Sequence, residues 1–125
     1  MNAAIVIKLV KDASAGLVGL HASHCVHRDV SSRNFLVDAN LDAVICDFGL
    51  SRVLQPDESE QNVTLAQGQS EMNFGPIMWM APEALRHRVY SEKTDTYQFA
   101  IFLVEVFARG SPYPGMSVLE VGHKV

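Results

Sequence analysis

The chain has 125 residues, of which 48% are hydrophobic and 19% are charged, and its formal net charge is −4. This composition is typical of a globular protein, and the length suits one domain or part of one. The negative charge, without any run of Lys or Arg, argues against nucleic-acid binding, and two cysteines are too few for a zinc cluster or a dense disulfide framework.

The N-terminal third predicts one helix followed by a hairpin. Residues 4–21 should form an amphipathic helix, because apolar residues recur there at spacings of three and four. Two short apolar runs, 35–37 and 43–46, flank turn-forming residues at 38–42, which predicts a small two-stranded hairpin. The apolar stripe of the helix consists of Ile5, Leu9, Ala13, Leu17 and Leu20.

The rest of the chain predicts a loop and two further helices. Residues 55–73 are rich in Gln, Glu, Ser and Asn and show almost no apolar periodicity, so we expect a mobile loop. Residues 94–108 are apolar on nearly every side, which is typical of a buried helix. Gly110 is expected to stop this helix, and Ser117 with Glu120 has the pattern of a capping box that opens another.

No segment of the sequence indicates secretion or membrane insertion. The first ten residues lack the charged and apolar blocks of a signal peptide, and the longest apolar stretch, 99–104, is too short to span a bilayer. We therefore expect a cytoplasmic location, or the cytoplasmic part of a longer membrane protein, with no membrane contact from this segment. Cys25 and Cys46 are expected to be buried, reduced thiols.

Three short motifs occur in a fixed order along the chain. They are His27-Arg28-Asp29 followed by Asn34, then Asp47-Phe48-Gly49, then Ala81-Pro82-Glu83. Any one triplet would be a weak signal, but the ordered set is very specific. In these motifs the chain resembles the catalytic domain of eukaryotic protein kinases, and the resemblance covers nearly all of its length.

The resemblance implies transfer of the γ-phosphoryl group of ATP to a protein substrate, with Mg2+ as the metal cofactor. Asp29 would orient the attacking hydroxyl and accept its proton, and Arg33 would help to position the reacting groups. Asn34 and Asp47 would supply oxygen ligands to magnesium. Both residues lie at the ends of the expected hairpin, so a tight turn can bring them together.

The same resemblance implies supporting roles for residues around these motifs. Leu36 and Cys46 would line the nucleotide pocket, and a small apolar filler is the expected role of Cys46, with a reactive thiol as the alternative. His27 would pack against Phe48 instead of transferring a proton. Gly49 would give the backbone freedom directly after the metal-binding carboxylate.

Three further residues would fix or regulate the site. Asp95, at the start of the large helix, would hold the backbone of the catalytic loop by hydrogen bonds. Arg28 would capture a phosphate on the loop, so an acidic substitution at Thr64 or Ser70 is expected to raise activity. Glu83 matches a glutamate that pairs with a late arginine in the family, and no residue of this chain can take that arginine's place.

Each of these residues, taken singly, also has an ordinary structural interpretation. Asp29 could cap a turn and Asn34 could be a turn residue. Asp95 could be a helix N-terminal acid, and Arg28 could be a surface arginine without a regulatory role. The joint occurrence of the motifs favours the functional interpretation.

Details of the motifs place the chain near the tyrosine kinase and tyrosine-kinase-like groups. Ser31 stands where serine/threonine enzymes usually have a lysine, Arg33 stands where tyrosine-type enzymes have an arginine, and residues 75–80 also look tyrosine-kinase-like. Residues 47–83, however, contain no tyrosine. A tyrosine-kinase-like enzyme with serine/threonine or dual activity fits both facts. The candidate phospho-acceptors of the loop are Ser51, Ser59, Thr64 and Ser70.

The residues before His27 leave no room for the nucleotide-clamping half of a kinase domain. They are accounted for by one helix, so a Gly-rich loop, a strand lysine and its glutamate partner are missing. We expect a mainly α fold with small β-hairpins (α+β), a truncated kinase C-lobe without its N-lobe, as one partial domain over residues 1–125. The chain is then either a piece of an active kinase or a catalytically inactive binding or decoy module. The isolated chain is expected to have no measurable kinase activity.

Overall fold

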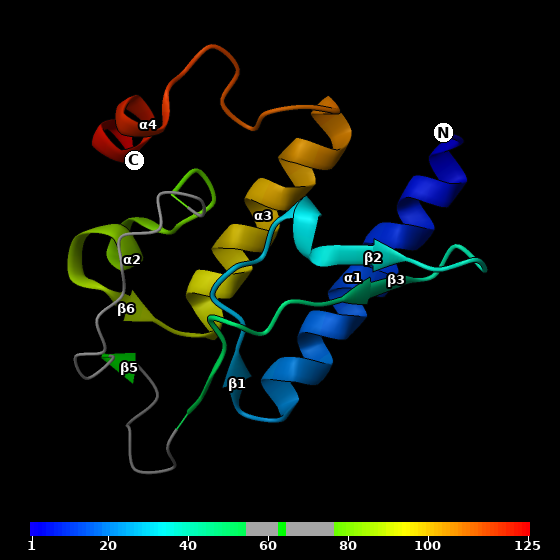
Figure 1. The fold of residues 1–125 in the computed structure, drawn as a ribbon, viewed down its shortest axis with the longest axis horizontal. Helices are drawn as coiled ribbons and strands as arrows, with labels where there is room; N and C mark the ends of the chain where they lie inside the picture. The colour runs from blue at the N-terminus through cyan, green and yellow to red at the C-terminus, as the bar shows by residue number, and fades with distance from the viewer. Residues whose placement is uncertain (55–62, 65–76) are drawn as a thin grey trace.

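The computed structural model describes residues 1–54, 63–64 and 77–125, and it combines helices with small antiparallel sheets (Figure 1). The mixture of helices and short strands agrees with the expected α+β class. In chain order the elements are α1 (Ala3–Ala22), β1 (Cys25–Val26), the 3-10 turn η1 (Ser32–Asn34), β2 (Phe35–Val37), β3 (Ala43–Ile45), β4 (Arg52–Val53), β5 (Val63–Thr64), α2 (Pro82–His87), β6 (Val89–Tyr90), α3 (Glu92–Ala108) and α4 (Val118–Lys124).

Helix α1 forms as the apolar spacing predicts and extends one residue further at each end. The side chain of Asn2 caps it by accepting a hydrogen bond from the N–H of Ala4 at 2.9 Å. Ala13 and Leu17 are its buried residues. A Cβ atom at Gly16 would lie 3.4 Å from Cγ2 of Ile45, so the missing side chain lets α1 approach strand β3 closely.

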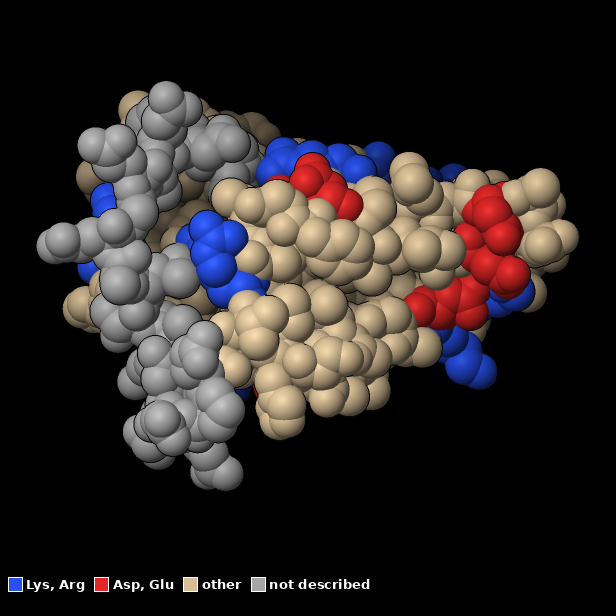
Figure 2. All heavy atoms as spheres, turned by 60° about the horizontal axis from the view of Figure 1, so that its bottom comes forward, with Lys and Arg blue, Asp and Glu red and all other residues tan. Residues whose placement is uncertain are grey.

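The predicted hairpin is confirmed as the antiparallel pair β2–β3, which places Phe35 opposite Ile45 and Leu36 opposite Val44. It packs on α1 through β3 (Figure 1). Its turn is also tied to α1, because Nζ of Lys8 donates to the C=O of Leu41 at 2.8 Å. Figure 2 shows acidic and basic side chains gathered at the end of the molecule where this turn lies.

Helix α3 begins two residues earlier than expected, at a capping box formed by Ser91 and Thr94. The expectation that this helix is buried on every side is wrong. Val104 and Phe107 are 48% and 62% exposed, whereas the buried residues of α3 include three polar ones. The reason is that the polar side of α3 faces backbone groups of the loop after β1, and those groups need hydrogen-bond partners. The buried residues are Thr94, Asp95, Gln98 and Phe102.

The remaining strands were not predicted, because elements of two residues carry no periodicity. Strand β1 pairs with β4, and β5 pairs with β6, in both cases antiparallel. Strand β5 interrupts the stretch expected to be a mobile loop, and the other residues of that stretch lie outside the described part of the chain. The capping box of Ser117 and Glu120 is confirmed at the start of α4. Among the described residues, no helix combines the length and apolarity needed to cross a bilayer.

The two thiols are free, as expected, but they are half-buried and not fully buried. Cys25 lies in the two-residue strand β1, and Cys46 directly follows β3. Burial still raises the pKa of the Cys25 thiol, and the Asp95 carboxylate adds to this effect.

Candidate active site

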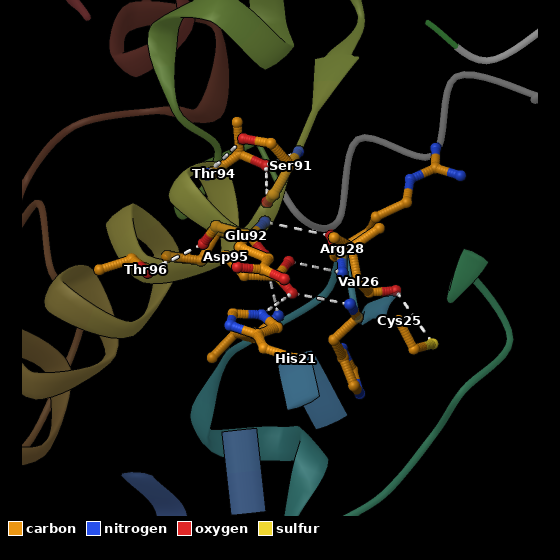
Figure 3. Close-up of polar contacts among 12 residues, drawn as sticks. His21, Cys25, Val26, Arg28, Ser91, Glu92, Thr94, Asp95 and Thr96 are labelled. Atoms are coloured by element: carbon orange, nitrogen blue, oxygen red, sulfur yellow. Dashed lines mark hydrogen bonds and ion pairs between the residues drawn. The ribbon is translucent and has the colours of Figure 1, made fainter. Parts of the chain in front are cut away.

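The loop after β1 is held at its start by the carboxylate of Asp95, which is fully buried. Asp95 accepts hydrogen bonds from the backbone N–H groups of His27 at 2.7 Å and Arg28 at 2.8 Å. Nε2 of His21, in the last turn of α1, lies 2.8 Å from the same carboxylate (Figure 3). One buried acid therefore ties together the end of α1, the start of α3 and the loop between them.

His27 lies inside the loop, and both of its ring nitrogens are used. Its Nδ1 accepts from the N–H of Asp29 at 3.1 Å, so the ring proton is on Nε2, which donates to the C=O of Cys46 at 2.9 Å. Its ring also packs against Phe48, with centroids 5.5 Å apart. The fully buried His27 thus joins the loop to the segment after β3 and has no nitrogen left for proton transfer.

Asp29 follows His27 by two residues in this loop, and its carboxylate is paired with Arg33. Nη2 of Arg33 donates to Oδ1 of Asp29 at 3.0 Å, and the guanidinium group of Arg33 lies 5.3 Å from the centre of the Trp79 ring. The turn η1 produces this pairing, because it places Arg33 four residues after Asp29 on the same side of the chain. The backbone C=O of Asp29 is fixed by Nδ2 of Asn34 at 2.6 Å.

Asn34 and Asp47 are brought together by the hairpin, as their positions in the sequence suggest. The backbone C=O of Asn34 accepts from the N–H of Cys46, the residue before Asp47, at 2.8 Å. Asp47 itself has a left-handed backbone, with φ of +59°, and its Oδ1 accepts from the N–H of Gly49 at 3.4 Å. A Cβ at Gly49 would lie 3.3 Å from that oxygen, so a glycine suits the close approach.

The donor set of Asn34 and Asp47 fits a magnesium ion. The amide nitrogen of Asn34 is used by Asp29, which leaves Oδ1 as the free end of the side chain, and Asp47 adds an exposed carboxylate. Mg2+ prefers oxygen ligands and is usually held by one or two side chains together with substrate phosphates.

The residues expected to line a nucleotide pocket lie on the hairpin beside this donor set. Leu36 is 60% exposed and is paired across the hairpin with Val44, which is 53% exposed. Cys46 is half-buried between the hairpin and Asp47. The exposed face of β2–β3 therefore presents an apolar surface directly next to Asn34 and Asp47.

The side chains of Arg28 and Glu83, the two expected regulatory or supporting residues, make no hydrogen bond or ion pair with Asp29 in the described part of the chain. Arg28 has a φ of +73°, and its side chain extends away from Asp95, with the guanidinium 4.0 Å from the centre of the Tyr90 ring (Figure 3). Its buried Nε has no hydrogen-bond partner within the described residues. Glu83 is exposed in the first turn of α2, and none of the ion pairs found in the described ranges involves it.

Two residues of the site were missed from the sequence, Gln98 and Glu105 of α3. Gln98 accepts from the N–H of Val30 at 3.0 Å and donates to the C=O of Arg28 at 3.1 Å. Glu105 accepts from the N–H and the hydroxyl of Ser32, at 3.2 and 2.5 Å. A signal was present: both are polar residues within an apolar run, and they lie three and ten residues after Asp95, on one helix face.

The match to a known family agrees with this geometry. A family model described as protein tyrosine and serine/threonine kinase matches residues 1–125, and the chain belongs to that family. Its members are protein kinases, which are phosphotransferases.

The relatives include a dual specificity protein kinase and a tyrosine-protein kinase. The dual specificity protein kinase shkA of Dictyostelium discoideum is 42% identical over 110 residues, which are 86% of this chain and 20% of shkA. The human tyrosine-protein kinase Fer is 40% identical over 112 residues, 89% of this chain and 13% of Fer. The macrophage colony-stimulating factor 1 receptor 2 of Takifugu rubripes is 40% identical over 104 residues, 82% of this chain and 10% of the receptor. The chain thus spans a fifth or less of the length of these relatives.

Proposed function

We propose that this chain is the C-lobe part of a protein kinase domain that transfers the γ-phosphoryl group of ATP to a hydroxyl of a protein substrate. One observation carries the proposal: the carboxylate of Asp29 projects from a loop whose backbone is fixed on both sides, and it is paired with Arg33 at 3.0 Å. Catalysis of phosphoryl transfer consists mainly of positioning and electrostatic stabilisation, which such a loop can provide.

In the proposed reaction, Asp29 orients the substrate hydroxyl and accepts its proton. Arg33 holds the carboxylate and, being exposed, can exchange this contact for one with the substrate. Asn34 and Asp47 would hold Mg2+, which neutralises negative charge on the phosphates of ATP. Leu36 and Cys46 would contact the nucleotide from the hairpin, and His27, Phe48 and Asp95 keep the loop in place.

We infer a tyrosine-kinase-like enzyme with serine/threonine or dual activity, located in the cytoplasm or on the cytoplasmic part of a membrane protein. Ser31 in place of a lysine and Arg33 beside Asn34 support the tyrosine-type grouping. The similarity to a dual specificity kinase as well as to a tyrosine kinase supports the broader hydroxyl specificity.

The test uses the protein at its full natural length, with labelled MgATP and a peptide mixture containing Ser, Thr and Tyr. The Asp29→Asn variant should lose at least about a hundredfold in kcat, because the base that accepts the proton is removed. Glu92→Gln is a matched control, since Glu92 is an exposed carboxylate in the first turn of α3. Wild-type protein that transfers no phosphate, or an Asp29→Asn variant as fast as wild type, would overturn the proposal and favour a non-catalytic binding module.

A further inference from the structure

The peptide groups on both sides of Asp29 are held by one side chain of α3. The carboxamide of Gln98 donates to the C=O of Arg28 at 3.1 Å and accepts from the N–H of Val30 at 3.0 Å. These two backbone groups belong to the residues directly before and directly after Asp29. Gln98 is 3% exposed and Val30 is fully buried, so water does not compete for these contacts.

The remaining polar groups of these two peptides, the N–H and the C=O of Asp29 itself, are also bound by side chains. Its N–H donates to Nδ1 of His27 at 3.1 Å, and its C=O accepts from Nδ2 of Asn34 at 2.6 Å. Side chains therefore bind all four polar groups of the two peptides that flank Asp29. Rotation of either peptide plane would break a contact, and it would also turn the Cα–Cβ bond that aims the carboxylate.

We propose that Gln98 is a positioning residue for Asp29, which holds the catalytic carboxylate in its productive direction through the two flanking peptides. A neutral carboxamide is suited to this role because it offers a donor and an acceptor side by side. A glutamate of the same shape would present an acceptor to the C=O of Arg28, and an apolar residue would offer neither group. Gln98 can take this role in catalysis only if the proposed kinase function holds.

The central experiment compares Gln98→Glu with wild type in the full-length protein, using labelled MgATP and measuring kcat and KM as a function of pH. At about pH 8 the variant should lose about tenfold or more in kcat, since small misplacements of a catalytic group are costly. As the pH is lowered towards about 6, the ratio of variant to wild-type kcat should rise. Burial favours the neutral carboxylic acid, which regains a donor for Arg28.

Two further variants separate positioning from general damage. Gln98→Met keeps the volume and removes both hydrogen bonds, so it should lose kcat without any recovery at low pH. Asn40→Asp adds the same charge on the exposed hairpin turn and should behave like wild type. A Gln98→Glu variant with wild-type kcat, or with a deficit that stays constant with pH, would contradict the positioning role.

Amide hydrogen exchange gives a readout that does not depend on activity. In Gln98→Met the N–H of Val30 should exchange at least about tenfold faster than in wild type, while the N–H of Leu17 in α1 should not change. This measurement also decides the case in which Gln98→Glu does not fold. If wild type transfers no phosphate, the proposed function fails, whereas an unchanged exchange rate at Val30 would overturn the role of Gln98 itself.

Discussion

The carboxylate of Glu105 accepts a hydrogen bond from the indole N–H of Trp79 at 3.1 Å. The same carboxylate binds Ser32 in the catalytic loop, so Glu105 joins that loop to the segment that precedes α2. Trp79 in turn lies beneath the guanidinium group of Arg33, which contacts Asp29. Glu105, near the C-terminal end of α3, thus supports the ion pair of Arg33 and Asp29 through Trp79.

Replacement of Glu105 should therefore destabilise the protein. In Glu105→Ala the partly buried indole N–H of Trp79 loses its acceptor, which costs about 1–3 kcal/mol, whereas the exposed N–H of Ser32 can bind water instead. Urea unfolding can be followed through the fluorescence of Trp79, the single tryptophan of the chain. Glu92→Ala removes an exposed glutamate from the same helix and should change the free energy of unfolding by less than about 0.5 kcal/mol. Equal effects of the two substitutions would refute the assigned contacts.

Asp95 should be still more sensitive to substitution. In Asp95→Asn one of the two oxygens becomes an NH2 group, which faces an N–H donor of the loop, either that of His27 or that of Arg28. Loss of a buried charged acceptor should lower the free energy of unfolding by at least about 2 kcal/mol. Asp42→Asn breaks an exposed contact with Lys8 and should cost no more than about 1 kcal/mol. Urea unfolding of the two variants, measured side by side, tests this prediction. If Asp95→Asn lowers the free energy of unfolding by less than Asp42→Asn does, the role of Asp95 as a buried acceptor is wrong.

Much of the site could be predicted because its residues lie close together in the sequence. The motifs around Asp29 and Asp47 are separated by a short hairpin, and the alternation of apolar runs and turn residues was enough to predict that hairpin. The contact between His27 and Phe48 was expected from the resemblance to protein kinases, and it is present in the structure. The left-handed backbone of Arg28 and Asp47 could not be predicted, since neither residue type requires it.

The contacts from α3 could not be predicted for a different reason. Gln98 and Glu105 reach the loop across 68 and 73 residues of sequence, and only the folded chain brings them near it. The apolar residues of α3 suggested a helix buried all round, whereas unpaired peptide groups of the loop draw its polar side inwards. Strands of two residues, such as β1 and β4, likewise depend on the partner and not on their own pattern.

Tyr97 should produce a late step in the alkaline titration of the protein. Burial raises the pKa of Tyr97 to about 12, and the neighbouring Tyr113 hydroxyl and Glu83 carboxylate add to this shift. Between about pH 10 and about pH 12 the unfolded state loses this proton before the folded state does, so stability falls as the pH rises.

The measurement is the ultraviolet absorbance of tyrosinate in wild type and in Tyr97→Phe. Their difference should have its midpoint near pH 12. In urea, where the chain is unfolded, this midpoint should move to about pH 10, the pKa of an unperturbed tyrosine. Tyr97→Phe should also show a weaker fall of stability over this range. A folded-state difference with its midpoint near pH 10 would show that the phenol is not desolvated.

The last prediction concerns Arg28, whose buried Nε has no partner in the described ranges and whose guanidinium stacks on Tyr90. Strand β6, which contains Tyr90, pairs with the strand that contains Thr64, whereas Ser70 lies outside the described residues. A negative charge introduced near this arginine gains a charge-assisted hydrogen bond and links the segment after Gly49 to the catalytic loop.

Thr64→Glu or Ser70→Glu in the full-length protein should therefore raise kcat/KM, by about fivefold or more if the coupling has the usual size. The increase should disappear in an Arg28→Ala background, where no guanidinium is left to bind the new carboxylate. Thr96→Glu, an exposed site on α3, is the matched control and should leave kcat/KM unchanged. Because the cycle compares ratios, any loss caused by Arg28→Ala alone cancels. An increase that persists without Arg28 would mean that the added charge acts through another group.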